Sequence, residues 1–211
     1  MSDFINTIDE LGDDVVSDSI IQRTITEFKD DKITKLGSYA FYGCTALETV
    51  DLPLVSTIVN WAFAGCSALK TVNCPNVTTF MGGYTFRYCS SLQAINLPLL
   101  SAFITGYEFQ GCSSLKYADF GNLSQIRLSF QGCTSLIALI LRKGTVTTLN
   151  SSAAFTNTTI ESGTGHIYVP RALIEDYKAA TNWSTHANQF RALEDYTVDG
   201  TTTGELDETK I

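Results

Sequence analysis

The sequence predicts an α/β repeat solenoid, in which short parallel strands stack on one another and a helical cap closes the C-terminal end. The prediction rests on a unit that recurs every 21–25 residues between residues 33 and 170. Self-similarity at such a period is typical of solenoids. A unit this short accommodates one strand, a turn and a return segment, whereas the familiar helical repeats need about 33 residues or more.

Each unit carries the same spaced residues. A cysteine follows a phenylalanine by three positions, a leucine follows the cysteine by three, and an alternating apolar segment such as Val50 and Leu52 closes the unit. The phenylalanines are Phe41, Phe63, Phe86, Phe109, Phe130 and Phe155. The cysteines are Cys44, Cys66, Cys89, Cys112 and Cys133, with Thr158 in the sixth unit. Alternation indicates strands, so we expect a right-handed stack of about six coils, roughly 30 Å long at about 4.8 Å per coil.

Residues 1–32 are expected to form an N-terminal cap with an acidic leader. The first 31 residues hold nine acidic residues and only two basic ones. Apolar residues that indicate one or two strands are Ile20, Ile21, Ile25 and Phe28. A solenoid needs such a cap because its first coil would otherwise expose core residues to water.

After Pro170 the spacing of apolar residues changes to three and four, which is typical of an amphipathic helix. The residues concerned are Leu173, Tyr177, Ala180, Trp183, Ala187, Phe190 and Leu193. Asn182 and Ser184 are expected to divide the helix, with Ser184 as an N-cap. We therefore expect a helical C-terminal cap over residues 171–196. Residues 197–211 are expected to form a polar, acidic tail that is flexible or ordered only by a partner.

The segment from Phe41 to Pro53 reads Phe-Tyr-Gly-Cys-Thr-Ala-Leu-Glu-Thr-Val-Asp-Leu-Pro. This motif resembles the BspA-type leucine-rich repeat. The resemblance covers about residues 33–170, and five of the six units keep the Phe-x-x-Cys-x-x-Leu spacing. It implies a leucine-rich-repeat solenoid of the kind found in many bacterial surface and secreted proteins. It also implies adhesion to host proteins, matrix or other cells.

The cysteines are expected to be buried structural thiols. Five of them share one position of the repeat, so stacking places them in one interior column, where each acts as a small apolar residue. Neither His166 nor His186 repeats with them, so we expect no cysteine nucleophile with a histidine base. Two separate histidines also do not supply the three or four converging ligands of a zinc site. The sequence therefore predicts no enzyme, no metal and no cofactor.

Recognition is expected on the outward side of the strands. If Val50 and Leu52 point inward, Thr49 and Asp51 point outward. The candidate ligand-binding face comprises Glu48, Thr49, Asp51, Lys70, Asn73, Gln93, Asn96, Lys116, Tyr117, Asp119, Ile137, Ile140 and Tyr168. Its carboxylates and amides are suited to hydrogen bonds with a sugar or a peptide, and Ile137 with Ile140 is expected to form an apolar contact patch. The simpler interpretation is a solvated face that keeps the strands soluble.

The leading hypothesis is a non-enzymatic recognition or adhesion module that binds a protein or a glycan. The alternative is a structural or assembly component, such as part of a phage-like particle, that contacts its partners through the caps or the tail. The net charge of −8 and the acidic ends provide no basic face for nucleic acid.

No stretch of 18 apolar residues predicts a membrane span. The acidic start lacks the basic and apolar regions of a secretory signal. The cellular location, the ligand and the oligomeric state stay open.

Overall fold

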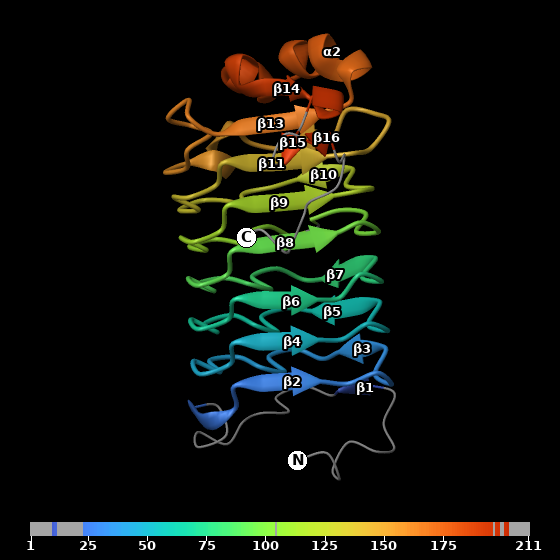
Figure 1. The fold of residues 1–211 in the computed structure, drawn as a ribbon, viewed down its shortest axis with the longest axis vertical. Coiled ribbons are helices and arrows are strands. Elements are labelled where there is room, and N and C mark those ends of the chain that lie inside the picture. The colour runs from blue at the N-terminus through green and yellow to red at the C-terminus, as the bar shows by residue number, and fades with distance from the viewer. Residues whose placement is uncertain (1–9, 12–22, 104, 196, 199–200, 203–211) are drawn as a thin grey trace.

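The computed structural model describes residues 10–11, 23–103, 105–195, 197–198 and 201–202 and shows coils stacked along one axis (Figure 1). Each described coil contributes a short strand to a first stack of strands. Most coils also contribute one to a second stack. Neighbouring strands within both stacks pair in parallel. The predicted repeat solenoid is confirmed.

The first stack runs the length of the molecule, and its outward side is the strand face. It consists of a three-stranded sheet and a five-stranded sheet. The strands of the first sheet are β2 (Glu27–Lys29), β4 (Thr49–Asp51) and β6 (Thr71–Asn73). Those of the second are β8 (Ala94–Leu97), β9 (Tyr117–Phe120), β11 (Ala138–Leu141), β13 (His166–Val169) and β14 (Phe190–Ala192). Where the two sheets meet, the Gln93 N–H lies 3.5 Å from the Lys70 carbonyl oxygen.

The second stack lies on another side of the coils. Its strands are β1 (Glu10–Leu11), β3 (Lys35–Leu36), β5 (Thr57–Val59), β7 (Thr79–Met81), β10 (Gln125–Ile126) and β12 (Thr148–Leu149). In the second stack, the described residues of the coil between β7 and β10 form no strand, but the backbone contacts continue there. The Ser101 N–H donates to the Thr78 carbonyl, and the Ser124 N–H donates to the Ser101 carbonyl. Hydrogen bonds between coils are therefore maintained past the break.

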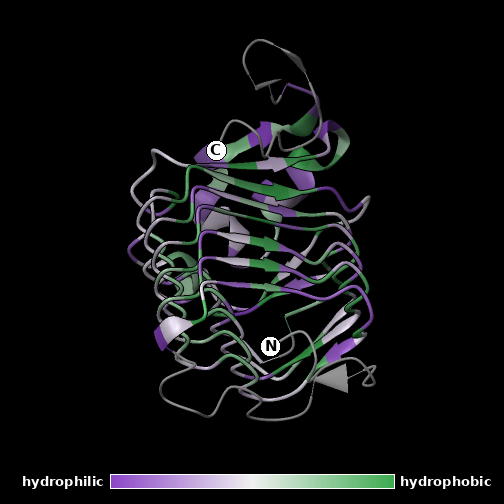
Figure 2. Cartoon of the chain, turned by 60° about the horizontal axis from the view of Figure 1, so that its bottom comes forward, coloured by the Kyte–Doolittle hydropathy of each residue, from purple (hydrophilic) through white to green (hydrophobic). Residues whose placement is uncertain are grey.

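The core consists of columns of identical residues. From Phe41 to Phe155, neighbouring phenylalanine rings stack with centroids 5.1–5.8 Å apart and planes within 7° of each other. All six rings are completely buried. Figure 2 shows the corresponding pattern in hydropathy, with residues of like colour at matching places in neighbouring coils. Each coil thus buries its apolar side against the coils next to it, as in other repeat proteins.

All six cysteines are free and buried, as the sequence predicts. The Cys66 thiol donates a hydrogen bond to the carbonyl of Phe41 in the preceding coil, with Sγ and O 3.0 Å apart. Cys89, Cys112 and Cys133 repeat this contact at 3.1 Å. Burial raises the pKa of the Cys74 thiol to about 12. At neutral pH this thiol is therefore protonated and unreactive.

The C-terminal cap is less helical than predicted. Its helices are η2 (Arg171–Leu173), α2 (Ile174–Ala179), η3 (Trp183–Gln189) and η4 (Leu193–Asp195), and η1 (Ser152–Phe155) lies in the last coil. Asn182, with a left-handed φ of 64°, separates α2 from η3 and is the N-cap residue of η3. Ser184 lies inside η3 and is not its N-cap. Phe190, expected in the helix, begins β14, which pairs with β13. An added strand satisfies backbone groups that the edge of β13 would otherwise expose.

The parallel strands extend beyond the boundaries expected for the repeats. β2 lies within residues 1–32, and β14 lies after Pro170. Two short strands, β15 (Thr197–Val198) and β16 (Thr201–Thr202), pair in antiparallel fashion. The remainder of the expected acidic leader and tail, residues 1–9, 12–22, 199–200 and 203–211, lies outside the described residues.

One carboxyl group is enclosed in the core. The Glu108 side chain is completely buried. Its Oε1 accepts a hydrogen bond from the Gly106 N–H at 2.9 Å, and its Oε2 accepts one from Ser129 Oγ at 2.7 Å. Burial is the larger effect and raises the pKa of Glu108 above its usual value, although both hydrogen bonds oppose the shift. Ionisation of Glu108 therefore opposes folding.

We expect the free energy of unfolding to depend on pH through Glu108. Since its pKa is higher in the folded state, its contribution to stability is complete below the unfolded pKa and is lost as pH rises through the folded pKa. Glu108→Gln keeps a group that can bond to Ser129 but cannot ionise. Urea unfolding between pH 4 and pH 7 should show the variant gaining stability over wild type as pH rises. A difference between Glu108→Gln and wild type that stays constant over this pH range would contradict the prediction.

Candidate ligand-binding site on the strand face

The pairing of strands places the predicted side chains in columns on the strand face. Asp51 lies beside Asn73, and Asn96 lies beside Asp119. Asp119 in turn lies beside Ile140, which pairs with Tyr168. Residues 21–28 positions apart in the chain therefore line up along the solenoid axis, apart from the junction between β6 and β8.

Over β2, β4 and β6 the strand face is polar and open. Lys70 Nζ lies 2.8 Å from Glu48 Oε2, and each side chain is about half exposed, at 49% and 48%. Asn73 Nδ2 donates to Asp51 Oδ1 at 2.7 Å. Exposed pairs of this kind contribute roughly 0–1 kcal/mol to stability, because water competes for them and ordering two long side chains costs entropy. A ligand can therefore replace these contacts at small cost.

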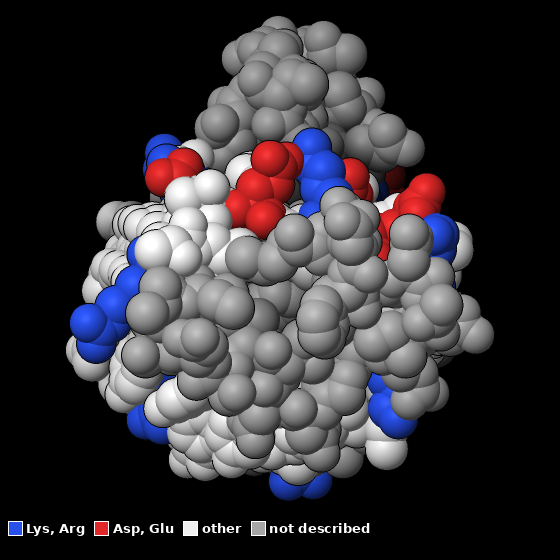
Figure 3. All heavy atoms as spheres, turned by 90° about the horizontal axis from the view of Figure 1, so that it is seen from below, with Lys and Arg blue, Asp and Glu red and all other residues white. Residues whose placement is uncertain are grey.

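A shallow groove of ≈ 280 Å³ lies on this polar half of the face. Its lining residues are Glu27, Lys29, Thr49, Val50, Asp51, Thr71, Val72 and Asn73. Three of them, Thr49, Asp51 and Asn73, belong to the face predicted from the sequence. Figure 3, seen from the N-terminal end, shows acidic and basic side chains side by side along this edge of the molecule. We call these eight residues the polar groove.

The part of the strand face formed by β8, β9, β11, β13 and β14, which we call its upper half, differs from the prediction at Asp119. This residue is only 2% exposed. Its Oδ1 accepts a hydrogen bond from Arg142 Nε at 2.8 Å and its Oδ2 one from Arg142 Nη2 at 2.6 Å. Arg142 occupies the position of the repeat at which the first three coils have proline. Because arginine stands there in this coil, its side chain covers the Asp119 carboxylate. Asp119 is therefore a paired, buried group and not an exposed ligand contact.

The prediction of an exposed apolar patch at Ile137 and Ile140 is wrong. Ile137 is exposed, at 42%, but Ile140 is completely buried. Ile140 packs with Ala138, and Leu193 of η4 lies against both. The chain that leaves the C-terminal cap thus returns over this part of the face. A repeat pattern alone gives no sign of that return.

The other predicted residues remain partly accessible. Lys116 is exposed, and Gln93, Asn96, Tyr117 and Tyr168 are half-buried. Tyr117 and Tyr168 contribute to the apolar cluster around Ile140. Burial raises the pKa of Tyr168. Among the described residues of the strand face, those of the polar groove therefore combine accessibility with several adjacent polar groups.

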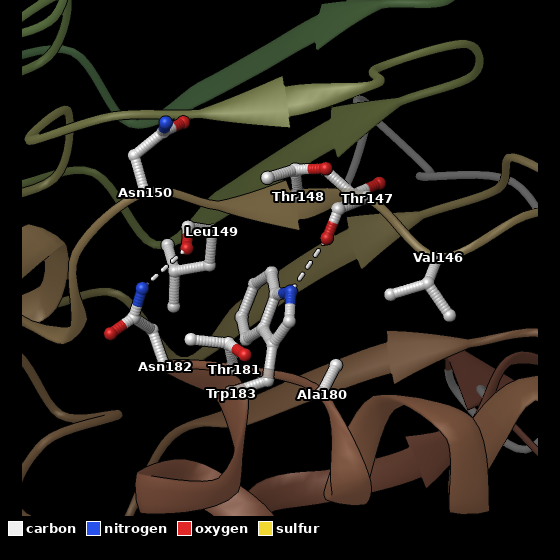
Figure 4. Close-up of a pocket in the computed structure, with 9 residues that line it drawn as sticks. All are labelled: Val146, Thr147, Thr148, Leu149, Asn150, Ala180, Thr181, Asn182 and Trp183. Atoms are coloured by element: carbon white, nitrogen blue, oxygen red, sulfur yellow. Dashed lines mark hydrogen bonds between the residues drawn. The ribbon is translucent and has the colours of Figure 1, made fainter.

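A larger hollow, ≈ 410 Å³, lies where the cap meets the last coil (Figure 4). Here β12 is the last strand of the second stack, and cap side chains take the place of a further strand. Trp183 Nε1–H donates to the Thr147 carbonyl at 2.6 Å, and Asn182 Nδ2 donates to the Leu149 carbonyl at 2.7 Å. The Thr147 N–H donates to the Tyr177 hydroxyl at 2.9 Å. Because these groups bond to one another, the hollow is primarily a structural joint.

Sequence reasoning missed a second surface, formed by aromatic residues two positions before the repeated phenylalanine. Tyr39, Trp61, Tyr84 and Tyr107 stack ring on ring from coil to coil. We call these four residues the aromatic ladder. The signal was present in the sequence, since four consecutive units carry Tyr or Trp at this place.

Within the described residues, no group of three or more His, Cys, Asp or Glu side chains is arranged to hold a metal ion. The same part of the chain contains no helix that is both long and apolar enough to cross a bilayer.

Stacked coils with short parallel strands and buried columns of Phe, Cys and Leu define a leucine-rich-repeat solenoid. The BspA type leucine-rich repeat region matches the sequence in six copies, over residues 22–136 and 104–166. The chain belongs to this family.

Two solved structures support the fold. A leucine-rich cell surface protein from Faecalibacterium prausnitzii is 23% identical, with a TM-score of 0.59, over 76% of this chain and 42% of that one. The pneumococcal vaccine antigen PcpA is 18% identical, with a TM-score of 0.61, over 79% of this chain and 41% of that one. The chain thus spans about two fifths of the length of each relative. No curated protein matches it.

Proposed function

We propose that the chain is a non-enzymatic recognition module that binds a protein or a glycan through the polar groove of the strand face. The observation that carries the proposal is a groove whose half-exposed polar side chains pair mainly with one another. Each coil adds one row of side chains to such a face, so a ligand meets several rows at once. The F. prausnitzii relative is described as a cell surface protein, a setting in which recognition modules act.

The charges of the groove favour a ligand that offers both donors and acceptors. Lys29 Nζ lies 2.7 Å from Glu27 Oε1, and both side chains are more than half exposed. Asp51 and Asn73 add a carboxylate and an amide in the neighbouring coils. A ligand that carries hydroxyls, amides or paired charges can exchange with these contacts one for one. A purely apolar ligand cannot, because it would leave the polar groups unpaired.

We expect the double variant Asp51→Ala, Asn73→Ala to lose at least about tenfold in affinity, equivalent to 1.4 kcal/mol. The ligand is first identified by screening the full chain against arrays of glycans and matrix proteins, and the affinity is then measured by calorimetry. Lys116→Ala, on the upper half of the same face, is the matched control and should bind as wild type does. Binding that survives the double variant but is lost on changing the caps would favour the alternative of an assembly component.

A further inference from the structure

The aromatic ladder forms a continuous stripe that is only partly accessible, with Tyr39 exposed and Trp61, Tyr84 and Tyr107 half-buried. Ring centroids lie 6.1 Å apart from Tyr39 to Trp61, 4.4 Å from Trp61 to Tyr84 and 5.2 Å from Tyr84 to Tyr107. The planes of these neighbours differ by only 4–18°. Stacked rings cover one another's faces, so the inner rings of the ladder present only their edges to a ligand.

Two exposed tyrosines, Tyr42 and Tyr88, are not members of the ladder. Tyr42 is 45% exposed, and its ring makes angles of 77° with Tyr39 and 67° with Trp61. Tyr88 is 52% exposed. Tyr42 directly follows the phenylalanine of the first coil, whereas Tyr88 is the second residue after that of the third, next to Arg87, which holds the place of Tyr42. The two tyrosines thus lie two coils apart, or roughly 10 Å along the axis. These two rings are accessible to a ligand in a way that the stacked rings are not.

Tyr88 occupies a position at which four of the six units have glycine. The Phe-x-Gly-Cys motif places Gly43, Gly65, Gly111 and Gly132 there, with φ of 70–79°. Tyr88 adopts φ of 61° in the same place. Left-handed backbone is unfavourable for a residue with a bulky side chain. The ladder residues Tyr39, Trp61, Tyr84 and Tyr107 adopt similar φ of 57–65°, so what distinguishes Tyr88 is the exposed ring that it places where most coils have glycine.

Arg87, the neighbour of Tyr88, joins the exposed ring to the ladder. Its guanidinium carbon lies 4.5 Å from the ring centroid of Tyr88, 5.2 Å from that of Tyr84 and 5.6 Å from that of Trp61. Its Nη2 donates to the Tyr88 hydroxyl at 2.9 Å. Among the described residues its buried Nε has no hydrogen-bond partner. A planar cation with a spare donor is therefore held among aromatic rings.

An amide lies in the next coil, at the place that corresponds to Arg87. Gln110 Nε2 donates to Gln131 Oε1 at 3.2 Å. Its own Oε1 is buried and has no hydrogen-bond partner among the described residues. The surface around Tyr88 thus combines accessible aromatic rings with a guanidinium and a neighbouring amide side chain.

We propose that Tyr42, Tyr88 and Arg87 form a binding site for an extended β-linked oligosaccharide that runs along the solenoid axis. A pyranose ring has an apolar C–H face, which packs on an aromatic ring, and hydroxyls at its edge, which bond to guanidinium and amide groups. In an extended β-1,4-linked chain every second sugar presents the same face. Successive sugars advance by a distance close to the coil spacing of about 4.8 Å. Sugars two apart therefore meet Tyr42 and Tyr88.

A proline-rich peptide fits this surface less well. Such peptides dock in grooves between aromatic side chains. Here the ladder rings stack in contact with one another and leave no groove between them. Binding of a proline-rich peptide is therefore tested as the competing possibility.

The test is calorimetry of the full chain with cellohexaose, with chitohexaose and with a proline-rich decapeptide. We expect one of the two hexasaccharides to bind. Tyr88→Gly restores the residue of the repeat and should keep or raise the melting temperature, yet it should weaken binding at least tenfold. Tyr88→Phe keeps the ring and should retain most of the affinity. Tyr107→Leu introduces the residue that coil five carries at Leu128 and should bind as wild type does.

Three results would overturn the proposal. They are binding of neither hexasaccharide, tight binding of the peptide instead, and full binding by Tyr88→Gly. Substitutions at Asp51 and Asn73 in the polar groove should leave oligosaccharide binding at this site unchanged. Failure of this site and failure of the proposed function are therefore separable.

Discussion

Trp183→Ala is expected to lower the free energy of unfolding by about 3–5 kcal/mol, the range for removing a large aromatic side chain from a core. Trp183 is completely buried. Its ring centroid lies 5.5–5.8 Å from those of Tyr177, Phe190 and Phe155. It thus connects α2, β14 and the end of the phenylalanine column. Its loss creates a cavity at the joint and also leaves the Thr147 carbonyl without its indole partner.

Denaturation in guanidinium chloride measures this effect, and hydrogen exchange locates it. Exchange should accelerate first in α2 and β14, because terminal units of a solenoid contact only one neighbour. Trp183→Phe keeps most of the packing but loses the hydrogen bond, so it should cost about 1–3 kcal/mol. A loss below 1 kcal/mol for Trp183→Ala would contradict the packing of the cap on the last coil.

Arg142→Met is expected to cost about 3–5 kcal/mol, because it removes the cation from a buried carboxylate. The Asp119 side chain is only 3% exposed and that of Arg142 24%. Two hydrogen bonds join them. Methionine resembles the arginine stem in volume, so the effect reports the lost charge pairing more than lost packing. The measurement is chemical denaturation at pH 7.

Two further variants separate charge from packing at this pair. Asp119→Asn in the Arg142→Met background removes the buried negative charge that Arg142 pairs with and should recover most of the loss. Lys70→Met breaks the exposed pair with Glu48 and should change stability by roughly 0–1 kcal/mol. Equal effects at the buried and the exposed pair would show that water reaches Asp119 and that the strand face is open there.

The repeat pattern was sufficient to predict the architecture. A constant spacing of Phe41, Cys44 and Leu47 in successive units places like residues on like residues, and only a stack of coils satisfies this pattern. The burial of the six cysteines follows from the same spacing, as does the outward position of Asp51 and Asn73. These features depend on one unit and its nearest neighbours, so they can be read locally.

The same spacing left parts of the candidate site undetermined. Asp119 and Ile140 occupy outward positions by period, yet Arg142 covers the first and Leu193 packs over the second. Phe190 fits a helical spacing but pairs as a strand with Ile167, because the last coil has an open edge. The cover of Asp119 depends on a residue that departs from the repeat in the neighbouring coil, whereas the other two outcomes depend on the chain beyond the repeat.

The sequence by itself thus determined the solenoid, its inward columns and the polar half of the strand face, because repeated local contacts decide all three. Only the tertiary structure decided where the face is open and where it is covered, since that depends on how the C-terminal chain returns over it. It also decided that the aromatic ladder stacks into one surface around Arg87 and Tyr88. A spacing pattern records which residues share a position, whereas accessibility is a property of the assembled molecule.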